Sequence, residues 1–196
     1  RVILCTGTFL RGLMHVGERR TGGGREGAAS SEGLSAELRR LGFVLRRLKT
    51  GTPPRLHADS IAYDRLRAQP GDGDARPFSF RTRRFVPPAH HCWQAATNPR
   101  THALIRENLH RSPLYAGAIA GDGPRYCPSI EDKVVRFAGR ERHLLFLEPE
   151  GLDTPEVYVN GISTSLPADV QWQLVRSIEG LERAELVRFG YAVEYD

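Results

Sequence analysis

Apolar residues recur three to four positions apart in four stretches of the chain, which is the spacing of one face of an α-helix. Asparagine or proline stands near the start of three of these stretches, and glycine follows two of them, as helix ends favour. The predicted helices are residues 35–41, 101–110, 128–137 and 167–178.

Short apolar runs between these stretches predict β-strands. Val2–Leu4 with Cys5 is expected to be a buried strand that enters a tight turn. Phe78–Val86 alternates apolar and polar residues as a half-exposed strand does. The other predicted strands are residues 43–48, 143–147, 157–159, 186–188 and 191–195. Strands mixed with helices indicate the α/β fold class.

Two segments have the composition of phosphate-binding loops. Residues 17–33 are rich in glycine, so their backbone N–H groups could approach a phosphate beside Arg25, although a flexible linker has the same composition. Lys49–Arg55 combines two prolines and a glycine with a cation at each end. It predicts a rigid turn that either holds a phosphate or is solvated, and both interpretations stay open.

The composition of the 196-residue chain is that of a globular protein, with 40% hydrophobic and 26% charged residues. No apolar run approaches the roughly 20 residues that cross a bilayer. A net charge of +5 favours a polyanionic partner. Arg81, Arg83 and Arg84 alternate with aromatic residues, a pattern that suits contact with RNA and is equally explained by a charged, solvent-facing strand.

Three widely spaced cysteines argue against a disulfide framework and indicate a reducing compartment. No metal site is predicted, because His90, His91 and Cys92 lack the spacing of zinc ligands. The chain starts at Arg1 inside an apolar pattern and without an initiator methionine. We interpret it as an internal fragment of a longer enzyme.

Cys127 is the candidate reactive residue. It follows glycines and a proline, and it precedes Pro128, which suits the first turn of a helix. A helix N-terminus and the nearby cations Arg125 and Lys133 would favour a thiolate. The alternative is a buried structural cysteine beside an ordinary helix start.

Six segments resemble segments of the MnmG (GidA) family, the flavin-dependent enzymes that modify the wobble uridine of certain tRNAs. They follow one another in the family's order and span most of the chain. The segments are LKTGTPPR (48–55), RSPLYAG (111–117), GPRYCPSIEDKVVRF (123–137), FLEPEGL (146–152), NGISTSLP (160–167) and GYAVEYD (190–196).

The resemblance implies part of an FAD-binding dinucleotide fold with an inserted α/β NAD-binding domain. The implied domains are residues 1–48 (FAD-binding), 49–150 (NAD-binding) and 151–196 (a return toward the FAD-binding domain). Ser31 matches a flavin-contacting serine, and Cys127 matches a cysteine proposed as the nucleophile. The implied NAD-contacting residues are Gly123, Pro124, Arg125, Tyr126, Cys127, Pro128, Ser129, Ile130, Glu131, Asp132, Lys133, Val134, Val135, Arg136 and Phe137.

The same resemblance implies the reaction and its partners. FAD and NAD(H) are the expected cofactors and methylenetetrahydrofolate is the expected co-substrate, for addition of a carboxymethylaminomethyl or aminomethyl group to C5 of the uridine. The expected partners are tRNA, a GTPase of the MnmE type that binds a C-terminal domain outside this chain, and a second copy of the full-length enzyme. A bacterial cytoplasm is expected rather than a mitochondrion or a membrane, and the fragment alone is expected to be inactive.

Two other functions remain open from the sequence. A folate- and FAD-dependent tRNA uridine methyltransferase would share the fold, although the segments FLEPEGL and PRYCPSIEDK favour the MnmG family. A non-catalytic RNA-binding module would explain the basic charge and the arginine–aromatic stretch. A depressed pKa of the Cys127 thiol would distinguish an enzyme from such a module.

Overall fold

The structure is a computed structural model that describes residues 1–87, 90–121, 123 and 128–196. In these residues the strands are β1 (Leu13–Val16), β2 (Arg19–Gly22), β3 (Leu48–Thr52), β4 (Arg55–His57), β5 (Arg67–Gln69), β6 (Cys92–Ala96), β7 (Leu144–Pro149), β8 (Glu156–Asn160), β9 (Leu186–Arg188) and β10 (Tyr191–Tyr195). The α-helices are α1 (Gly33–Arg40), α2 (Pro99–Glu107), α3 (Ile130–Arg136) and α4 (Ala168–Arg176). Short 3-10 helices cover Ala58–Ser60, Tyr63–Arg65 and Leu109–Arg111.

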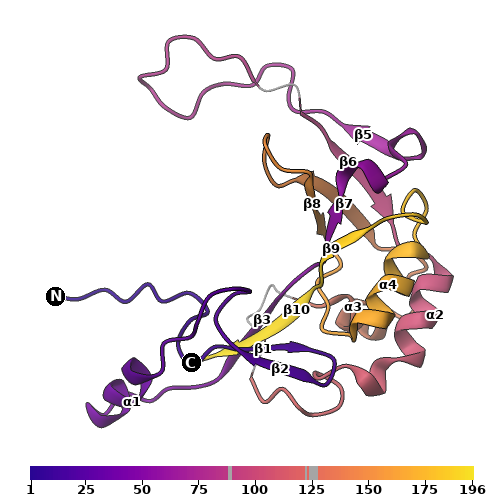
Figure 1. The fold of residues 1–196 in the computed structure, drawn as a ribbon. Helices are drawn as coiled ribbons and strands as arrows, with labels where there is room; N and C mark the ends of the chain where they lie inside the picture. The colour runs from indigo at the N-terminus through magenta and orange to yellow at the C-terminus, as the bar shows by residue number, and fades with distance from the viewer. Residues whose placement is uncertain (88–89, 122, 124–127) are drawn as a thin grey trace.

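The strands form two sheets, and every strand pair in them is antiparallel (Figure 1). One sheet has the order β2-β1-β10-β3, and the other has the order β5-β6-β7-β8-β4-β9. The predicted α/β class is confirmed as a mixed fold with two antiparallel sheets. The boundaries 1–48, 49–150 and 151–196 stay predictions.

The C-terminal strand β10 lies inside the first sheet, between β1 and β3. Glu194 of β10 is in register with Leu13 of β1 on one side and with Lys49 of β3 on the other. A segment from the end of the chain therefore completes a sheet whose other strands lie within the first 52 residues.

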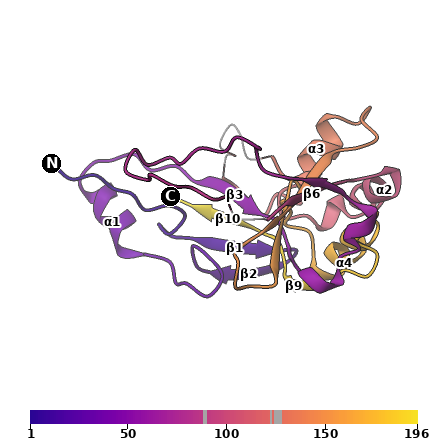
Figure 2. The same cartoon turned by 90° about the horizontal axis from the view of Figure 1, so that it is seen from above.

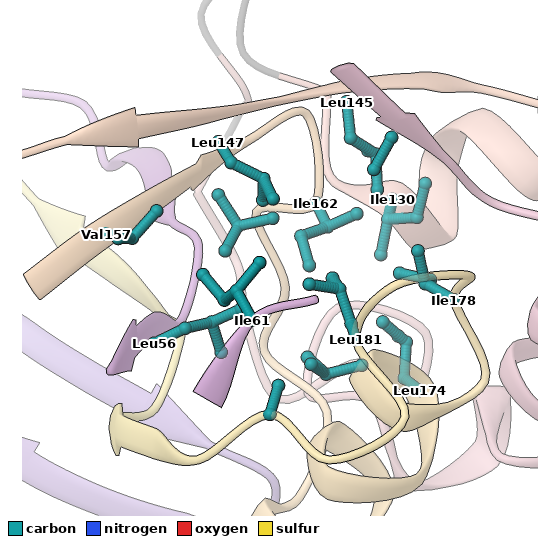
Figure 3. Packing of buried hydrophobic residues seen from close by; sticks show 14 of the residues in the cluster. Leu56, Ile61, Ile130, Leu145, Leu147, Val157, Ile162, Leu174, Ile178 and Leu181 are labelled. Atoms are coloured by element: carbon teal, nitrogen blue, oxygen red, sulfur yellow. The ribbon is translucent and has the colours of Figure 1, made fainter. Parts of the chain in front are cut away.

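The main core lies between one face of the six-stranded sheet and helices α2, α3 and α4 (Figures 2 and 3). Leu145 and Leu147 of β7 are fully buried, as expected for alternate residues that point to the same face of a strand. Ile105 of α2, Ile130 of α3 and Leu174 of α4 are fully buried against them in the same cluster. Helices α2, α3 and α4 are thus held on the sheet by burial of apolar side chains.

Three predicted helices are confirmed as α1, α2 and α4. Helix α2 begins at Pro99 because the Asn98 side chain accepts a hydrogen bond from the backbone N–H of Thr101 at 3.0 Å. Gly42 follows the C-cap of α1 with a positive φ of 89°, as a C-terminal glycine does. Gly180, predicted to terminate the last helix, lies beyond the C-cap of α4, which is Ser177. Local capping signals therefore explain the start of α2 and the end of α1.

The predicted strand at Val2–Leu4 is wrong. These residues form no strand, Val2 and Ile3 are more than 80% exposed, and Cys5 is exposed as well. The strand predicted at residues 43–48 starts only at Leu48, and Phe43 and Val44 are exposed. Apolar composition alone does not provide the neighbouring strand with which a strand must pair.

Two segments predicted as loops contain strands. Residues 19–22 of the glycine-rich segment form β2, which pairs with β1. In Lys49–Arg55, residues up to Thr52 belong to β3 and Arg55 starts β4, so only the two prolines lie between strands. The opposite error occurs at residues 78–86, which form no strand.

None of the helices in the described ranges is long and apolar enough to cross a membrane.

Two buried histidines should make the six-stranded sheet less stable in acid. The His102 and His143 rings stack 5.2 Å apart, and burial lowers the pKa of both, aided by Arg106 for His102 and by His102 itself for His143. The unfolded chain then binds protons more tightly, so stability is full above about pH 6.5 and falls as the pH drops below it. Each histidine contributes up to about 1.4 kcal/mol per pH unit.

Amide hydrogen exchange of β6 and β7 in the intact protein at pH 7, 6 and 5, corrected for intrinsic rates, measures this effect. The double variant His102→Gln, His143→Gln should show a weaker pH dependence than the wild type. His110→Gln is the matched control because His110 is exposed. An unchanged pH dependence in the double variant would show that His102 and His143 do not cause the loss of stability in acid.

Candidate functional site

Helix α3 begins two residues later than the sequence predicts. Ser129 is its N-cap and Ile130 its first residue, so Pro128 precedes the helix and does not lie in its first turn. The Ser129 hydroxyl accepts from the N–H of Asp132 at 3.1 Å, and the Asp132 carboxylate accepts from the N–H of Ser129 at 3.2 Å. This reciprocal capping box is encoded by serine followed three residues later by an acid.

The first turn of α3 is already hydrogen-bonded within the protein. The N–H of Ile130 donates to the carbonyl of Ser163 at 2.8 Å. The turn also carries two carboxylates, Glu131 and Asp132. Ile130 and Val134 are buried in the core, and Val135, Arg136 and Phe137 are exposed. The helix start therefore offers little to an anion such as a pyrophosphate.

Lys133 is also engaged by a neighbouring loop. Its ammonium donates to the carbonyl oxygen of Gly161 at 2.9 Å, and burial lowers its pKa. Lys133 is one of the implied NAD-contacting residues, and in this structure its ammonium is bound to a backbone carbonyl of the protein. Pro124, Arg125, Tyr126 and Cys127 lie outside the described residues, and the assignment of Gly123–Phe137 to NAD stays a prediction.

Glu131 connects the start of α3 to two other segments of the chain. Its carboxylate is completely buried and accepts from the N–H of Ser165 at 3.1 Å and from the Ser112 hydroxyl at 3.4 Å. Burial raises its pKa. Three sequence-distant segments thus meet at one acid, beside the start of α3.

Lys49 of β3 contacts the first turn of α3. It is buried, and its ammonium lies 3.5 Å from the Asp132 carboxylate. A Cβ built on Gly123 would lie 3.0 Å from Cε of Lys49, so the backbone of Gly123 lies against the lysine. The hydroxyl of Tyr115 donates to Asp132 at 3.3 Å, and burial together with Asp132 raises the pKa of Tyr115 to about 12. Gly123 and the first turn of α3 are both held by the same buried lysine.

Glu194 of β10 holds the chain just before this region. One carboxylate oxygen accepts from the N–H groups of Ala120 and Gly121 at 2.9 and 3.0 Å. The other lies 3.0 Å from Nε2 of the fully buried His15, whose pKa is lowered mainly by burial. A Cβ on Gly121 would lie 2.9 Å from the backbone of Leu48, so only glycine fits there. The first sheet therefore anchors the chain that leads to Gly123.

Ser31 lies in the second part of the candidate site, beside the turn after residue 5. Its N–H donates to the carbonyl of Phe9 at 2.7 Å, and its carbonyl accepts from the N–H of Arg11 at 2.9 Å. Both backbone groups of Ser31 are therefore engaged within the protein, and the residue is exposed. Its contact with a flavin stays a prediction.

The glycines near Ser31 allow two loops to pack backbone against backbone. A Cβ on Gly12 would lie 2.6 Å from the carbonyl oxygen of Gly23, and one on Gly24 would lie 2.6 Å from the Phe9 ring. The Thr8 hydroxyl donates to the carbonyl of Gly24 at 2.6 Å. The glycine-rich segment is thus an ordered part of the fold, and its interpretation as a flexible linker is wrong.

Asp196, which follows β10, fixes the Ser31 loop. Its N–H donates to the carbonyl of Leu10 at 2.8 Å. Its buried carboxylate forms ion pairs of 2.9–3.4 Å with Arg11, Arg39 and Arg47. Glu194 lies two residues earlier, within β10. The C-terminal end of the chain therefore anchors both the Ser31 loop and the segment that leads to Gly123 (Figure 1).

Sequence reasoning missed His15 and Glu194 as members of the site, and it considered Lys49 only as one end of a phosphate-binding or solvated turn. For Glu194 the available signal was a charged residue within a predicted strand, between Val193 and Tyr195. Such a residue is buried only when it is paired.

The other cysteines show no sign of catalytic chemistry. Cys92 lies half-buried in β6, where burial and then Glu148 raise its pKa, and Cys5 is exposed near the N-terminus. Among the residues that the structure describes, no three His, Cys, Asp or Glu side chains gather as metal ligands would.

The whole chain is similar to one protein family. A sequence model of the family described as "Glucose inhibited division protein A" matches residues 1–196. The "tRNA uridine 5-carboxymethylaminomethyl modification enzyme MnmG" of Myxococcus xanthus is 60% identical over 203 residues, which cover 100% of this chain and 33% of that protein. The protein of the same name from Geobacter metallireducens is 60% identical over 195 residues, covering 100% of this chain and 31% of its own length.

Solved structures give the same result. The form I crystal structure of Aquifex aeolicus GidA superposes with a TM-score of 0.88 at 52% identity, over 97% of this chain and 33% of that one. The form II crystal gives a TM-score of 0.86 at 49% identity, over 97% and 31%. The present chain spans about a third of the length of these relatives.

Proposed function

The chain belongs to the glucose inhibited division protein A family, and we propose that it forms part of a flavin-dependent enzyme that modifies the wobble uridine of tRNA. The family resemblance of the six sequence segments is confirmed by this match. The observation that carries the proposal is identity of about 60% over the entire chain with proteins named for tRNA uridine 5-carboxymethylaminomethyl modification.

The proposed reaction adds a carboxymethylaminomethyl or aminomethyl group to C5 of the uridine. The one-carbon unit would come from methylenetetrahydrofolate and the amine from glycine or ammonium. FAD, reduced by NADH, would supply a hydride. This chain would contribute Ser31 to the flavin pocket and Gly123–Phe137 to the nicotinamide cofactor site.

Within this proposal, the described residues mainly position the cofactor segments. Lys49 contacts Gly123 and Asp132, and Glu194 holds the N–H groups of Ala120 and Gly121. Arg125, outside the described residues, would contact the phosphates of NADH. Cys127 would act as nucleophile, toward C6 of the uridine or toward the one-carbon unit.

The partners belong to the proposal too. We expect tRNA as substrate, an MnmE-type GTPase bound through a part of the enzyme beyond this chain, and a homodimer of the full-length protein in the bacterial cytoplasm. The inserted NAD-binding domain within an FAD-binding fold is the architecture that this reaction would use.

Product analysis with the intact enzyme tests the function. The enzyme is incubated with unmodified tRNA, its GTPase partner, FAD, NADH, methylenetetrahydrofolate and glycine, and the tRNA nucleosides are identified by mass spectrometry. We expect a C5-carboxymethylaminomethyl uridine at the wobble position that requires NADH and glycine. A product that carries only a methyl group would favour the methyltransferase, and bound but unmodified tRNA would favour the RNA-binding module.

A further inference from the structure

The long connection between β5 and β6 projects from the edge of the six-stranded sheet (Figure 1). It runs from residue 70 to residue 91, far longer than most connections between adjacent strands. Loops of this length without regular structure are usually either functional or disordered. The residues considered below are 76–86, all of which the structure describes.

Phenylalanine side chains on this loop are exposed to solvent. Phe78 and Phe80 have relative exposures of 107% and 108%, and Phe85 is 42% exposed. A hydrogen bond from the N–H of Thr82 to the carbonyl of Ser79, at 3.1 Å, closes a turn in which Phe80 is the second residue. Burial of a phenylalanine is worth about 2 kcal/mol, so a projecting pair of rings is costly unless a partner covers it.

The same stretch carries a concentrated positive charge. Arg76, Arg81, Arg83 and Arg84 lie within it, and no acidic residue occurs from position 75 to position 91. In the part of the chain that the structure describes, none of these four arginines forms an ion pair. Several arginines elsewhere, such as Arg55 and Arg111, are paired with carboxylates.

We propose that residues 76–86 bind unpaired nucleotides of the RNA substrate, with Phe78 and Phe80 stacking on bases and the arginines contacting phosphates. Arginines interleaved with exposed aromatic rings match the two surfaces of single-stranded RNA, its charged backbone and its flat bases. An acidic protein partner would use the arginines but not the two rings in this way. This inference rests on the proposed function, because it takes tRNA as the substrate.

Binding of two RNA probes to the intact enzyme tests the inference. One probe is an anticodon stem-loop with unpaired nucleotides, and the other is a fully paired duplex of equal length. The double variant Phe78→Ala, Phe80→Ala should bind the stem-loop about tenfold more weakly for each ring, and the duplex nearly as well as the wild type does. Phe43→Ala is the matched control, since Phe43 is another exposed phenylalanine on a different part of the chain.

The arginines are tested by the salt dependence of binding. Arg83→Gln with Arg84→Gln should reduce the slope of log K against log salt by about 1.4, or about 0.7 per charge, whereas the phenylalanine variant should leave the slope unchanged. Stem-loop affinity equal to that of the wild type in both double variants would overturn the inference. So would a phenylalanine double variant that loses as much affinity for the duplex as for the stem-loop. A change in dimerisation or GTPase binding without a change in RNA affinity would assign the loop to a protein partner and overturn it as well.

Failure of this inference is distinguishable from failure of the proposed function. NADH-driven flavin reduction without tRNA should be the same in all these variants, which shows that they fold. If the wild type modifies tRNA and the variants bind RNA as it does, only the role of the loop is refuted. If the wild type does not modify tRNA at all, the function itself is refuted.

Discussion

The variant Cys127→Ser of the intact enzyme should lose tRNA modification by about a thousandfold or more, while NADH continues to reduce its flavin. The nucleophilic form of cysteine is the thiolate, and a serine hydroxyl stays protonated near neutral pH. Hydride transfer from NADH to flavin needs no thiolate, so this half-reaction reports the folding of the variant and its cofactor content. The two measurements are the amount of modified wobble uridine and the rate of flavin bleaching.

Cys5→Ser and Cys92→Ser are the controls for this result. Cys5 is exposed and Cys92 has a pKa raised by burial and by Glu148, so neither should abolish the modification. A structural role of Cys127 predicts the reverse pattern, with a lower melting temperature and activity retained in the folded fraction. If Cys127→Ser modifies tRNA at the wild-type rate, Cys127 is not the nucleophile.

Local signals in the sequence were sufficient for several elements of the fold. The bounds of β9 and β10 are those predicted, and α2 and α4 begin within two residues of their predicted starts. The cap of α2, Asn98, acts over three residues and can be recognised without tertiary information.

The errors occur where the environment of a side chain depends on distant parts of the chain. Val2–Leu4 and Phe43–Val44 have the composition of buried strands, yet no strand of the described residues pairs with them. Phe78 and Phe80 have strand propensity but project from a loop. Propensity indicates which residues can fill a strand, whereas pairing decides whether one forms.

The candidate site could be predicted only in part for the same reason. Its central segment was recognisable as a family motif, but Lys49 and Glu194 reach it from strands that are more than 70 residues away in the sequence. Their position follows from the strand order β1-β10-β3, which no local pattern encodes. The capping box of α3 was encoded locally, whereas the hydrogen bond of Lys133 to the carbonyl of Gly161, 28 residues away, was visible only in the structure.

Among the site residues that the sequence did not reveal, substitution of Glu194 should have the largest effect on stability. Glu194→Ala removes the acceptor for the N–H groups of Ala120 and Gly121 and for the buried His15 ring. An unsatisfied buried polar group costs about 1–3 kcal/mol. Ala120 is exposed, so water can replace the lost acceptor there, whereas the buried His15 ring has no access to water. We expect the first sheet to lose about 2–4 kcal/mol of stability.

The same substitution should also weaken NADH binding, because Ala120 and Gly121 lead directly to Gly123. We expect a rise of about tenfold in the NADH concentration needed for half-maximal flavin reduction, with a smaller change in the maximal rate. Glu194→Gln should recover most of both losses, since an amide oxygen can still accept from the two N–H groups.

Hydrogen exchange of β1 and β10 in the intact enzyme, together with the NADH dependence of flavin reduction, separates the two effects. Glu179→Ala is the control: Glu179 is an exposed acid in a 3.6 Å surface ion pair with Arg65, and its removal should cost at most about 1 kcal/mol. If Glu194→Ala loosens the sheet and leaves the NADH dependence unchanged, Glu194 stabilises the fold without positioning the cofactor segment. If neither quantity changes, the hydrogen bonds of Glu194 do not anchor the chain before Gly123, because an acceptor shared by three donors cannot be removed from a buried site without cost.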